Sequence, residues 1–103
     1  MYASMTTTQG TAADMVELAR MSGETMDGWL RELEGFRGLL MLSSEESGRT
    51  QVLTLWESAE VAERHRASRM RLRDLITGTV GVEVLETATY EVAFANLSEL
   101  HTR

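Results

Sequence analysis

The stretch GFRGLLMLSSEESGRTQVLTLWESAEVA, from Gly35 to Ala62, decides the fold. It contains an apolar run over 36–42 and a strand-like run over 49–55, joined by a polar, acidic turn. Ser58 then stands where a helix begins, and its hydroxyl is suited to accept a backbone N–H at the N-cap. This order predicts a β-hairpin that runs into a helix, the middle of a β-α-β-β-α-β chain.

The segments on either side complete this pattern. The threonine-rich stretch over 2–8 is typical of a strand. Thr11 is expected to cap the first helix. Gly78 is expected to end the second helix, and alternating apolar residues then predict a last strand over 80–94, with a bulge near Glu86-Thr87. The expected class is α+β, a ferredoxin-like four-stranded antiparallel sheet with helices on one face.

Each predicted helix carries one apolar stripe at spacings of three and four residues, which indicates a face turned to the core. Gly23 and Gly28 interrupt the first helix, so a bend or break near Ser22-Gly23 is expected. Trp29 lies on the stripe and is expected to pack in the core. The first stripe comprises Met15, Leu18, Ala19, Ser22, Met26, Trp29, Leu30 and Leu33, and the second Val61, His65, Leu72, Leu75 and Ile76.

Arginines flank the second stripe, and two interpretations of them are open. They form either an anion-binding ridge or a solvated face paired with nearby acids, and the second interpretation is favoured. The arginines are Arg64, Arg66, Arg69, Arg71 and Arg73, and the expected acidic partners are Glu60, Glu63 and Asp74.

The two hairpin strands are apolar on both faces, which has a consequence for assembly. Helices cover only one face of such a sheet, so the second apolar face needs a partner. We therefore expect a homodimer formed through the open sheet face.

Composition limits the classes of function. The 103 residues predict a single domain over 1–103, with a core over about 2–94 and a short polar tail over 95–103. A net charge of −6 argues against nucleic-acid binding, and no apolar stretch is long enough to cross a membrane. With no cysteine there is no thiolate chemistry. A metal site is disfavoured, because no histidine or carboxylate pair at ligand spacing accompanies His65 apart from Glu60 and Glu63. The N-terminus lacks the features of a signal peptide, so the default expectation is a cytoplasmic protein.

Three motifs carry a resemblance to a known family. They are Gly10-Thr11-Ala12 before the first helix, Glu34-Gly35-Phe36-Arg37-Gly38 at the second strand, and Val52-Leu53-Thr54-Leu55-Trp56-Glu57-Ser58 at the end of the third. Across residues 9–94 the chain resembles the antibiotic biosynthesis monooxygenase-like proteins of the dimeric α/β-barrel superfamily. The resemblance implies two facing sheets in a homodimer and a pocket between each sheet and its own helices. Its members include cofactor-independent oxygenases of polycyclic phenols, haem-degrading enzymes and proteins without an assigned activity.

The haem-degrading members use an Asn, a Trp and a His that this chain lacks. By alignment those three positions are Ala3, His65 and Leu75. A haem-binding relative is therefore the disfavoured alternative, and no cofactor is expected.

A cofactor-independent oxygenase needs a dry pocket, a base and donors for an anionic oxygen. His65 is the candidate base, because its ordinary pKa lies near physiological pH. Arg69 and Tyr90 are the candidate substrate-binding residues. Each also has a structural interpretation: His65 as a core residue, Arg69 as a surface charge and Tyr90 as a filler of the strand face. Trp56 is expected to pack structurally, and His101 in the tail is poorly placed for a site.

The leading expectation is thus a homodimer that binds a small apolar or aromatic molecule in a sheet–helix pocket, with cofactor-independent oxygenation as the activity. The alternative is a non-catalytic dimeric ligand-binding or regulatory module.

Overall fold

The computed structural model describes residues 1–10, 14–80 and 82–97. Four strands and three helices follow one another in the order β-α-β-β-α-α-β. The expected cap at Thr11 lies outside the described residues. The elements are β1 Tyr2–Gln9, α1 Met15–Leu30, β2 Phe36–Ser44, β3 Arg49–Trp56, α2 Ala59–Arg64, α3 Arg66–Val80 and β4 Glu83–Glu91.

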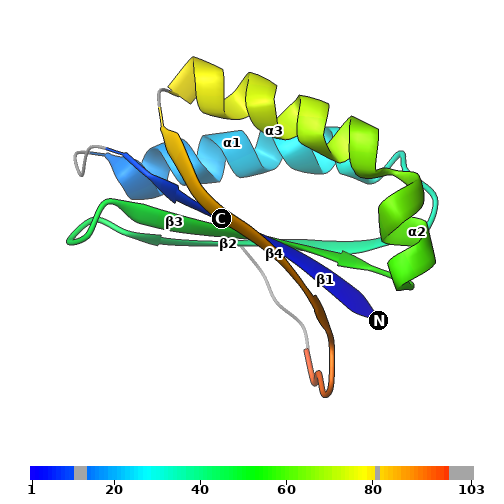
Figure 1. The fold of residues 1–103 in the computed structure, drawn as a ribbon. Helices are drawn as coiled ribbons and strands as arrows, with labels where there is room; N and C mark the ends of the chain where they lie inside the picture. Colours follow the sequence, from blue (N-terminus) through cyan, green and yellow to red (C-terminus); the bar gives the residue numbers. More distant parts are fainter. Residues whose placement is uncertain (11–13, 81, 98–103) are drawn as a thin grey trace.

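The strands form one antiparallel sheet in the order β2-β3-β1-β4. Helices α1 and α3 lie side by side on one face of this sheet, and α2 closes one end (Figure 1). The ferredoxin-like α+β fold predicted from the sequence is confirmed.

The register of the central strands places polar and apolar residues on different faces. Strand β1 pairs with β3 from Tyr2↔Trp56 to Gln9↔Arg49, so even-numbered residues of both strands face the helices. Strand β1 also pairs with β4, and this register shifts between Thr7 and Thr8. On β4 this register shift falls between Val84 and Glu86. The bulge predicted near Glu86-Thr87 is therefore confirmed, one or two residues from the expected position.

Two glycines hold turns that other residues would strain. Gly35 precedes β2 with φ 86°, and Gly48 closes the β2–β3 hairpin with φ 73°. The N–H of Gly10 donates a hydrogen bond to the Gly48 carbonyl at 2.9 Å. A Cβ on residue 48 would lie only 2.5 Å from the Gly10 carbonyl oxygen. The hairpin is therefore tied to the end of β1 by a backbone contact that only glycine permits.

Trp56 is the centre of the core. Its side chain is fully buried, and the ring of Phe36 meets it edge-on with centroids 5.5 Å apart. Ser58 caps α2 by accepting from the N–H of Val61 at 3.2 Å, which turns Val61 and its neighbours toward this ring. The predicted packing role of Trp56 and the predicted cap at Ser58 are both confirmed.

The predicted helices need three corrections. The second helix is two helices, because the backbone at His65 leaves helical geometry (φ −100°, ψ 15°), and α3 continues past Gly78 to Val80. Helix α1 is unbroken at Gly23. Trp29 is not in the core but half exposed, because consecutive helical residues point about 100° apart and Leu30 takes the inward position.

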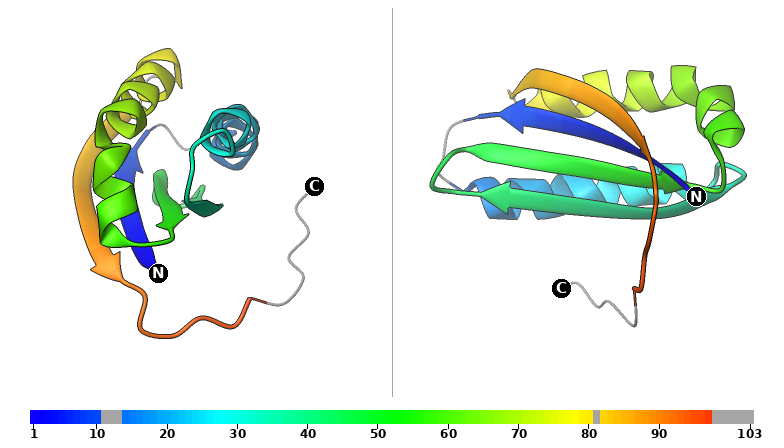
Figure 2. Two further views of the ribbon diagram at one scale, coloured as in Figure 1. Left: turned by 90° about the vertical axis from the view of Figure 1, so that its right-hand side faces the viewer. Right: turned by 60° about the horizontal axis from the view of Figure 1, so that its bottom comes forward.

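After β4 the chain leaves the domain on the side away from the helices (Figure 2). The N–H of Val92 still donates to the carbonyl of Met1 at 2.9 Å, but Phe94 beyond it is 85% exposed. No helix among the described residues is long and apolar enough to span a membrane.

Candidate functional site

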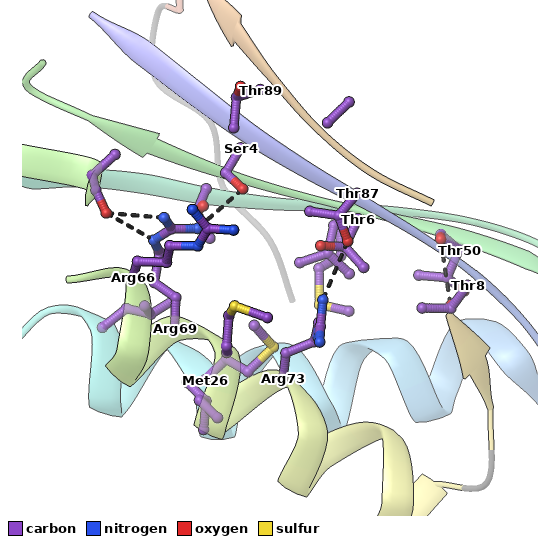
Figure 3. Close-up of a pocket in the computed structure, with 18 of the residues that line it drawn as sticks. Ser4, Thr6, Thr8, Met26, Thr50, Arg66, Arg69, Arg73, Thr87 and Thr89 are labelled. Atoms are coloured by element: carbon purple, nitrogen blue, oxygen red, sulfur yellow. Dashed lines mark hydrogen bonds between the residues drawn. The ribbon is translucent and has the colours of Figure 1, made fainter. Parts of the chain in front are cut away.

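A cavity of about 680 Å³ lies between the sheet and the helices α1 and α3. This volume is within the range of small-molecule pockets, roughly 300–1,000 Å³. Its floor is the helix-facing side of the sheet, and its walls are the inner faces of the two helices (Figure 3).

Hydroxyl groups dominate the floor. They come from alternate positions of three adjacent strands, which all point to the same face. Some are bonded within the sheet: the Thr8 hydroxyl donates to the Thr50 carbonyl at 3.4 Å, and the Thr54 hydroxyl accepts from the indole N–H of Trp56 at 2.9 Å. The floor residues are Ser4, Thr6, Thr8, Thr50, Thr54, Thr87 and Thr89.

Helix α1 supplies an apolar wall. The stripe predicted for this helix lines the cavity from Met15 to Leu30, apart from Trp29. Met41 of β2 and Met70 of α3 extend this surface. Methionine is flexible and its sulfur is polarisable, so such a wall adapts well to a flat aromatic surface.

Helix α3 supplies a charged wall. Arg66, Arg69 and Arg73 line the cavity at spacings of three and four residues, so they share one helix face. Arg66 pairs with Glu63 at 3.5 Å, and Arg73 pairs with Asp74 at 3.0 Å. The predicted pairing of the arginines with nearby acids is confirmed for these two and for Arg64, which lies 3.9 Å from Glu60, yet Arg66 and Arg73 also face the cavity.

Arg69 has different surroundings. Its guanidinium donates twice to the carbonyl of Ala62, from Nε at 3.2 Å and Nη2 at 2.9 Å, and once to the hydroxyl of Ser4, from Nη1 at 3.2 Å. It also lies over the ring of Trp56, 5.6 Å from the centroid. Burial lowers the pKa of Arg69 below its ordinary value, because desolvation disfavours the charged form. Arg69 is thus a half-buried cation at the cavity wall.

His65 lies outside the cavity wall. Its ring packs against Trp56, with centroids 5.7 Å apart. The Nε2 nitrogen lies 2.9 Å from the Glu34 carbonyl oxygen, which can only accept, so Nε2 donates and Nδ1 is the nitrogen able to take a proton. Of the three residues proposed from the sequence, only Arg69 lines the cavity within the described ranges.

Tyr90 lies on the other side of the sheet. It pairs with Ala3 in the β1–β4 register, on the face that the helices leave open, and is half exposed. The structure therefore does not bring Tyr90 together with Arg69. A ligand role for Tyr90 stays a prediction.

The hydroxyl floor was not predicted from the sequence, and Arg66 and Arg73 were considered only in the disfavoured interpretation of the arginines as an anion-binding ridge. The period-two alternation of Ser4, Thr6 and Thr8 was visible, but it was interpreted only as strand propensity. The three-and-four spacing of Arg66, Arg69 and Arg73 was equally visible.

The described residues offer no evident metal or haem site. Within them no group of three His, Asp or Glu side chains is placed to hold a metal ion. No histidine of the described ranges lines the cavity, and His65 is engaged by the Glu34 carbonyl, so these residues do not fit a haem held there through a histidine. His101 lies outside the described residues.

Comparison with known proteins identifies the fold. No protein-family model and no curated protein matches the chain. Among solved structures, a candidate antibiotic biosynthesis monooxygenase from Deinococcus radiodurans is similar, with a TM-score of 0.68 and 19% identity over 96% of this chain and 99% of that one. The monooxygenase ActVA-Orf6 of Streptomyces coelicolor, solved with the ligand nanaomycin D, has a TM-score of 0.68 and 16% identity over 95% and 92%. SnoaB, a cofactor-independent oxygenase from Streptomyces nogalater, has a TM-score of 0.59 and 10% identity over 91% and 92%.

Proposed function

Because the chain has the fold of the antibiotic biosynthesis monooxygenases, we propose that it binds a small, mostly apolar aromatic molecule in the sheet–helix cavity and oxidises it with dioxygen without a cofactor. The observation that carries this proposal is the cavity itself, about 680 Å³ with an apolar wall, a hydroxyl floor and a half-buried arginine. The similarity to ActVA-Orf6 and SnoaB supports it.

The residues of the cavity suit this chemistry. An anthrone-type substrate is oxidised at its ring methylene, which becomes a carbonyl. One atom of dioxygen enters the product, and the other leaves as water with the two methylene hydrogens. The substrate must first lose a proton, and the electron-rich anion then reacts with dioxygen. Donors that hold anionic oxygen favour this ionisation, and the floor hydroxyls are such donors, while Arg69 is placed to hold an anionic oxygen of the ligand.

The base is a separate proposal. His65 remains the proposed base, although its ring packs against Trp56 and is not part of the cavity lining. A side-chain movement must therefore bring it to a substrate bound in the cavity. We expect turnover by His65→Ala to fall by about 10²–10⁴-fold if His65 takes the proton. Turnover equal to that of the unmodified protein would remove His65 from the mechanism.

Oxygen consumption with anthrone-type substrates tests the activity, measured against the spontaneous rate without protein. Ser22 lines the cavity from α1, whereas its neighbour Met21 is 52% exposed on the outside of the same helix. Ser22→Phe fills the cavity and is expected to abolish turnover, while Met21→Phe adds a similar ring outside and is expected to leave turnover unchanged. Binding without oxygen uptake would favour the non-catalytic ligand-binding module, and absence of both would refute the proposal.

The proposal includes a homodimer formed through the open sheet face, as in a dimeric α/β barrel. Apolar side chains meet there in cross-strand rows, such as Met5, Leu53 and Leu40. Leu42 on this face is 52% exposed, an arrangement that a second copy of the chain would cover.

Sedimentation tests the dimer. Leu42→Asp places a charge on the open face and is expected to give a monomer. Val16→Asp places the same charge on the outer side of α1, where Val16 is 49% exposed, and is expected to leave the dimer intact. A monomer at high concentration of the unmodified protein would contradict this part of the proposal.

A further inference from the structure

The charge of the cavity differs from that of the whole protein. The chain carries a net charge of −6, yet three arginines of α3 line the cavity along one helix face, against two glutamates, Glu60 and Glu63. Figure 3 shows Arg66, Arg69 and Arg73 along the wall that faces the floor hydroxyls. An acidic protein that directs arginines into its main cavity has a local preference for anions.

Arg69 is the arginine of this wall whose charge is least compensated. Arg66 and Arg73 have carboxylate partners, Glu63 and Asp74. Within the described residues Arg69 forms no ion pair, and its hydrogen-bond acceptors are a backbone carbonyl and a serine hydroxyl. Glu63, Arg66 and Tyr2 are the ionisable groups that act on it through space, and Glu63 is already bonded to Arg66. An anion in the cavity would supply the missing counter-charge.

The Arg69 guanidinium also has N–H groups that are not used in hydrogen bonds to the described residues. A guanidinium has five N–H groups. Within the part of the chain that the structure describes, those of Arg69 make three hydrogen bonds, two to the Ala62 carbonyl and one to the Ser4 hydroxyl. One N–H therefore remains on each terminal nitrogen, and a planar carboxylate is the group that two such donors bind best.

The opposite wall is suited to the rest of the ligand. Met15, Met26 and Met41 line the cavity together with Leu18 and Ala19, and none of these side chains offers a strong donor or acceptor. A molecule lying across the cavity would thus meet thioether and methyl groups at one end and a guanidinium at the other. This arrangement selects an amphipathic ligand with an acid group at one end.

We propose that the ligand is an aromatic carboxylic acid, with its carboxylate on Arg69 and its rings against the methionines of α1 and β2. This inference rests on the proposed function, because it assumes that the cavity binds an aromatic molecule. In this arrangement Arg69 binds the carboxylate, and the hydroxyls of the cavity floor bind the oxygen of the reacting ring. The hydroxyls of Thr6 and Thr89 are available for this, because they make no hydrogen bond within the described part of the chain.

Calorimetric titration with three related compounds tests the assignment. The compounds are anthraquinone-2-carboxylate, its neutral carboxamide and 2-hydroxyanthraquinone. For the unmodified protein we expect the acid to bind at least about tenfold more tightly than the amide, since hydrogen bonds to charged groups contribute about that much. Equal affinities for acid and amide, or a preference for the phenol over both, would overturn the inference while leaving the proposed function intact. Binding of none of the three would instead count against the proposed function.

Variants of Arg69 test whether this residue causes the preference for the carboxylate over the carboxamide. Arg69→Met keeps an unbranched side chain but removes the charge, and we expect the acid to lose its advantage while the amide stays within about threefold of its original affinity. Arg71→Met is the control, because Arg71 is exposed and is not part of the cavity wall. An unchanged acid preference in Arg69→Met would overturn the inference.

The pH dependence gives a measurement that needs no variant. A guanidinium stays protonated at any ordinary pH, so the preference for the acid is expected to be flat between about pH 6 and 9. A histidine anchor would release its proton as the pH rises through about 6.5, and the preference would then disappear. Loss of the preference with a midpoint near that value would overturn the assignment to Arg69.

Discussion

Replacing Thr54 by valine isolates the hydrogen bond that holds the central tryptophan. The indole N–H of Trp56 donates to the Thr54 hydroxyl at 2.9 Å, and Trp56 is fully buried while Thr54 is only 8% exposed. Valine has nearly the shape of threonine but offers no acceptor. The substitution therefore leaves a buried donor without a partner and changes little else.

The expected cost follows from this burial. An unsatisfied buried donor costs about 1–3 kcal/mol, out of a total stability of about 5–15 kcal/mol for a domain of this kind. Thr54→Val should accordingly lower Tm by several degrees, since each kcal/mol corresponds to about 4–8 °C at this size. In a Trp56→Phe background no N–H is left to satisfy, so the same substitution should cost no more than about 0.5 kcal/mol.

Urea unfolding followed by circular dichroism measures all four proteins of this cycle, and Thr54→Ser serves as a control that keeps the hydroxyl. We expect a coupling of at least about 1 kcal/mol between the two positions. An equal loss in both backgrounds, or no loss in either, would show that this hydrogen bond does not stabilise the tryptophan.

Three further predictions concern backbone and capping. Gly35→Ala should cost at least about 1–3 kcal/mol in urea unfolding, because φ is 86° there and a Cβ would lie 2.4 Å from Val61; a neutral result would refute the turn assignment. Gly28→Ala, with nothing within 4 Å of the added Cβ in a helix, should instead raise the unfolding free energy by about 0.5–1 kcal/mol, and a loss would contradict the open surroundings. Ser58→Ala should cost about 0.5–2 kcal/mol through the lost cap of α2, whereas Ser58→Asp should keep most of it.

The strands could be predicted from the sequence because their signals are local. The apolar run after Gly35 and the strand-like run before Trp56 lie within one or two residues of the observed β2 and β3. Ser58 marked the next helix by its own hydrogen-bonding chemistry, which does not depend on distant parts of the chain.

The break at His65 could not be predicted from the sequence, because it depends on packing. The stripe from Val61 onward continues in helical spacing through this position, yet the backbone leaves the helix where the ring of His65 meets Trp56 and the Glu34 carbonyl. Arg69, a surface charge under the favoured interpretation, faces the cavity because it lies one turn after His65 and one turn before the buried Leu72, while Leu75 of the predicted stripe is 57% exposed.

The cavity was expected, but the chemistry of its lining was not. A pocket between sheet and helices was implied by the resemblance, with a mostly apolar lining. The hydroxyls of Ser4, Thr54 and Thr87 share that lining only because β1 pairs with both β3 and β4 in this register. Sequence alternation shows which residues share a face of one strand, but the pairing of strands far apart in the sequence decides which faces combine.

Methyl NMR of the methionines tests most directly whether the cavity is the binding site. Four of the seven methionines line the cavity, and the other three lie at the N-terminus, on the open sheet face or outside α1. The cavity set is Met15, Met26, Met41 and Met70, and the outside set is Met1, Met5 and Met21. Titration of the protein, labelled with ¹³C at the methionine methyl groups, with anthraquinone-2-carboxylate is predicted to shift the four cavity signals and leave the outside three in place. Shifts at Met5 on the open face, with the cavity signals unmoved, would contradict the account.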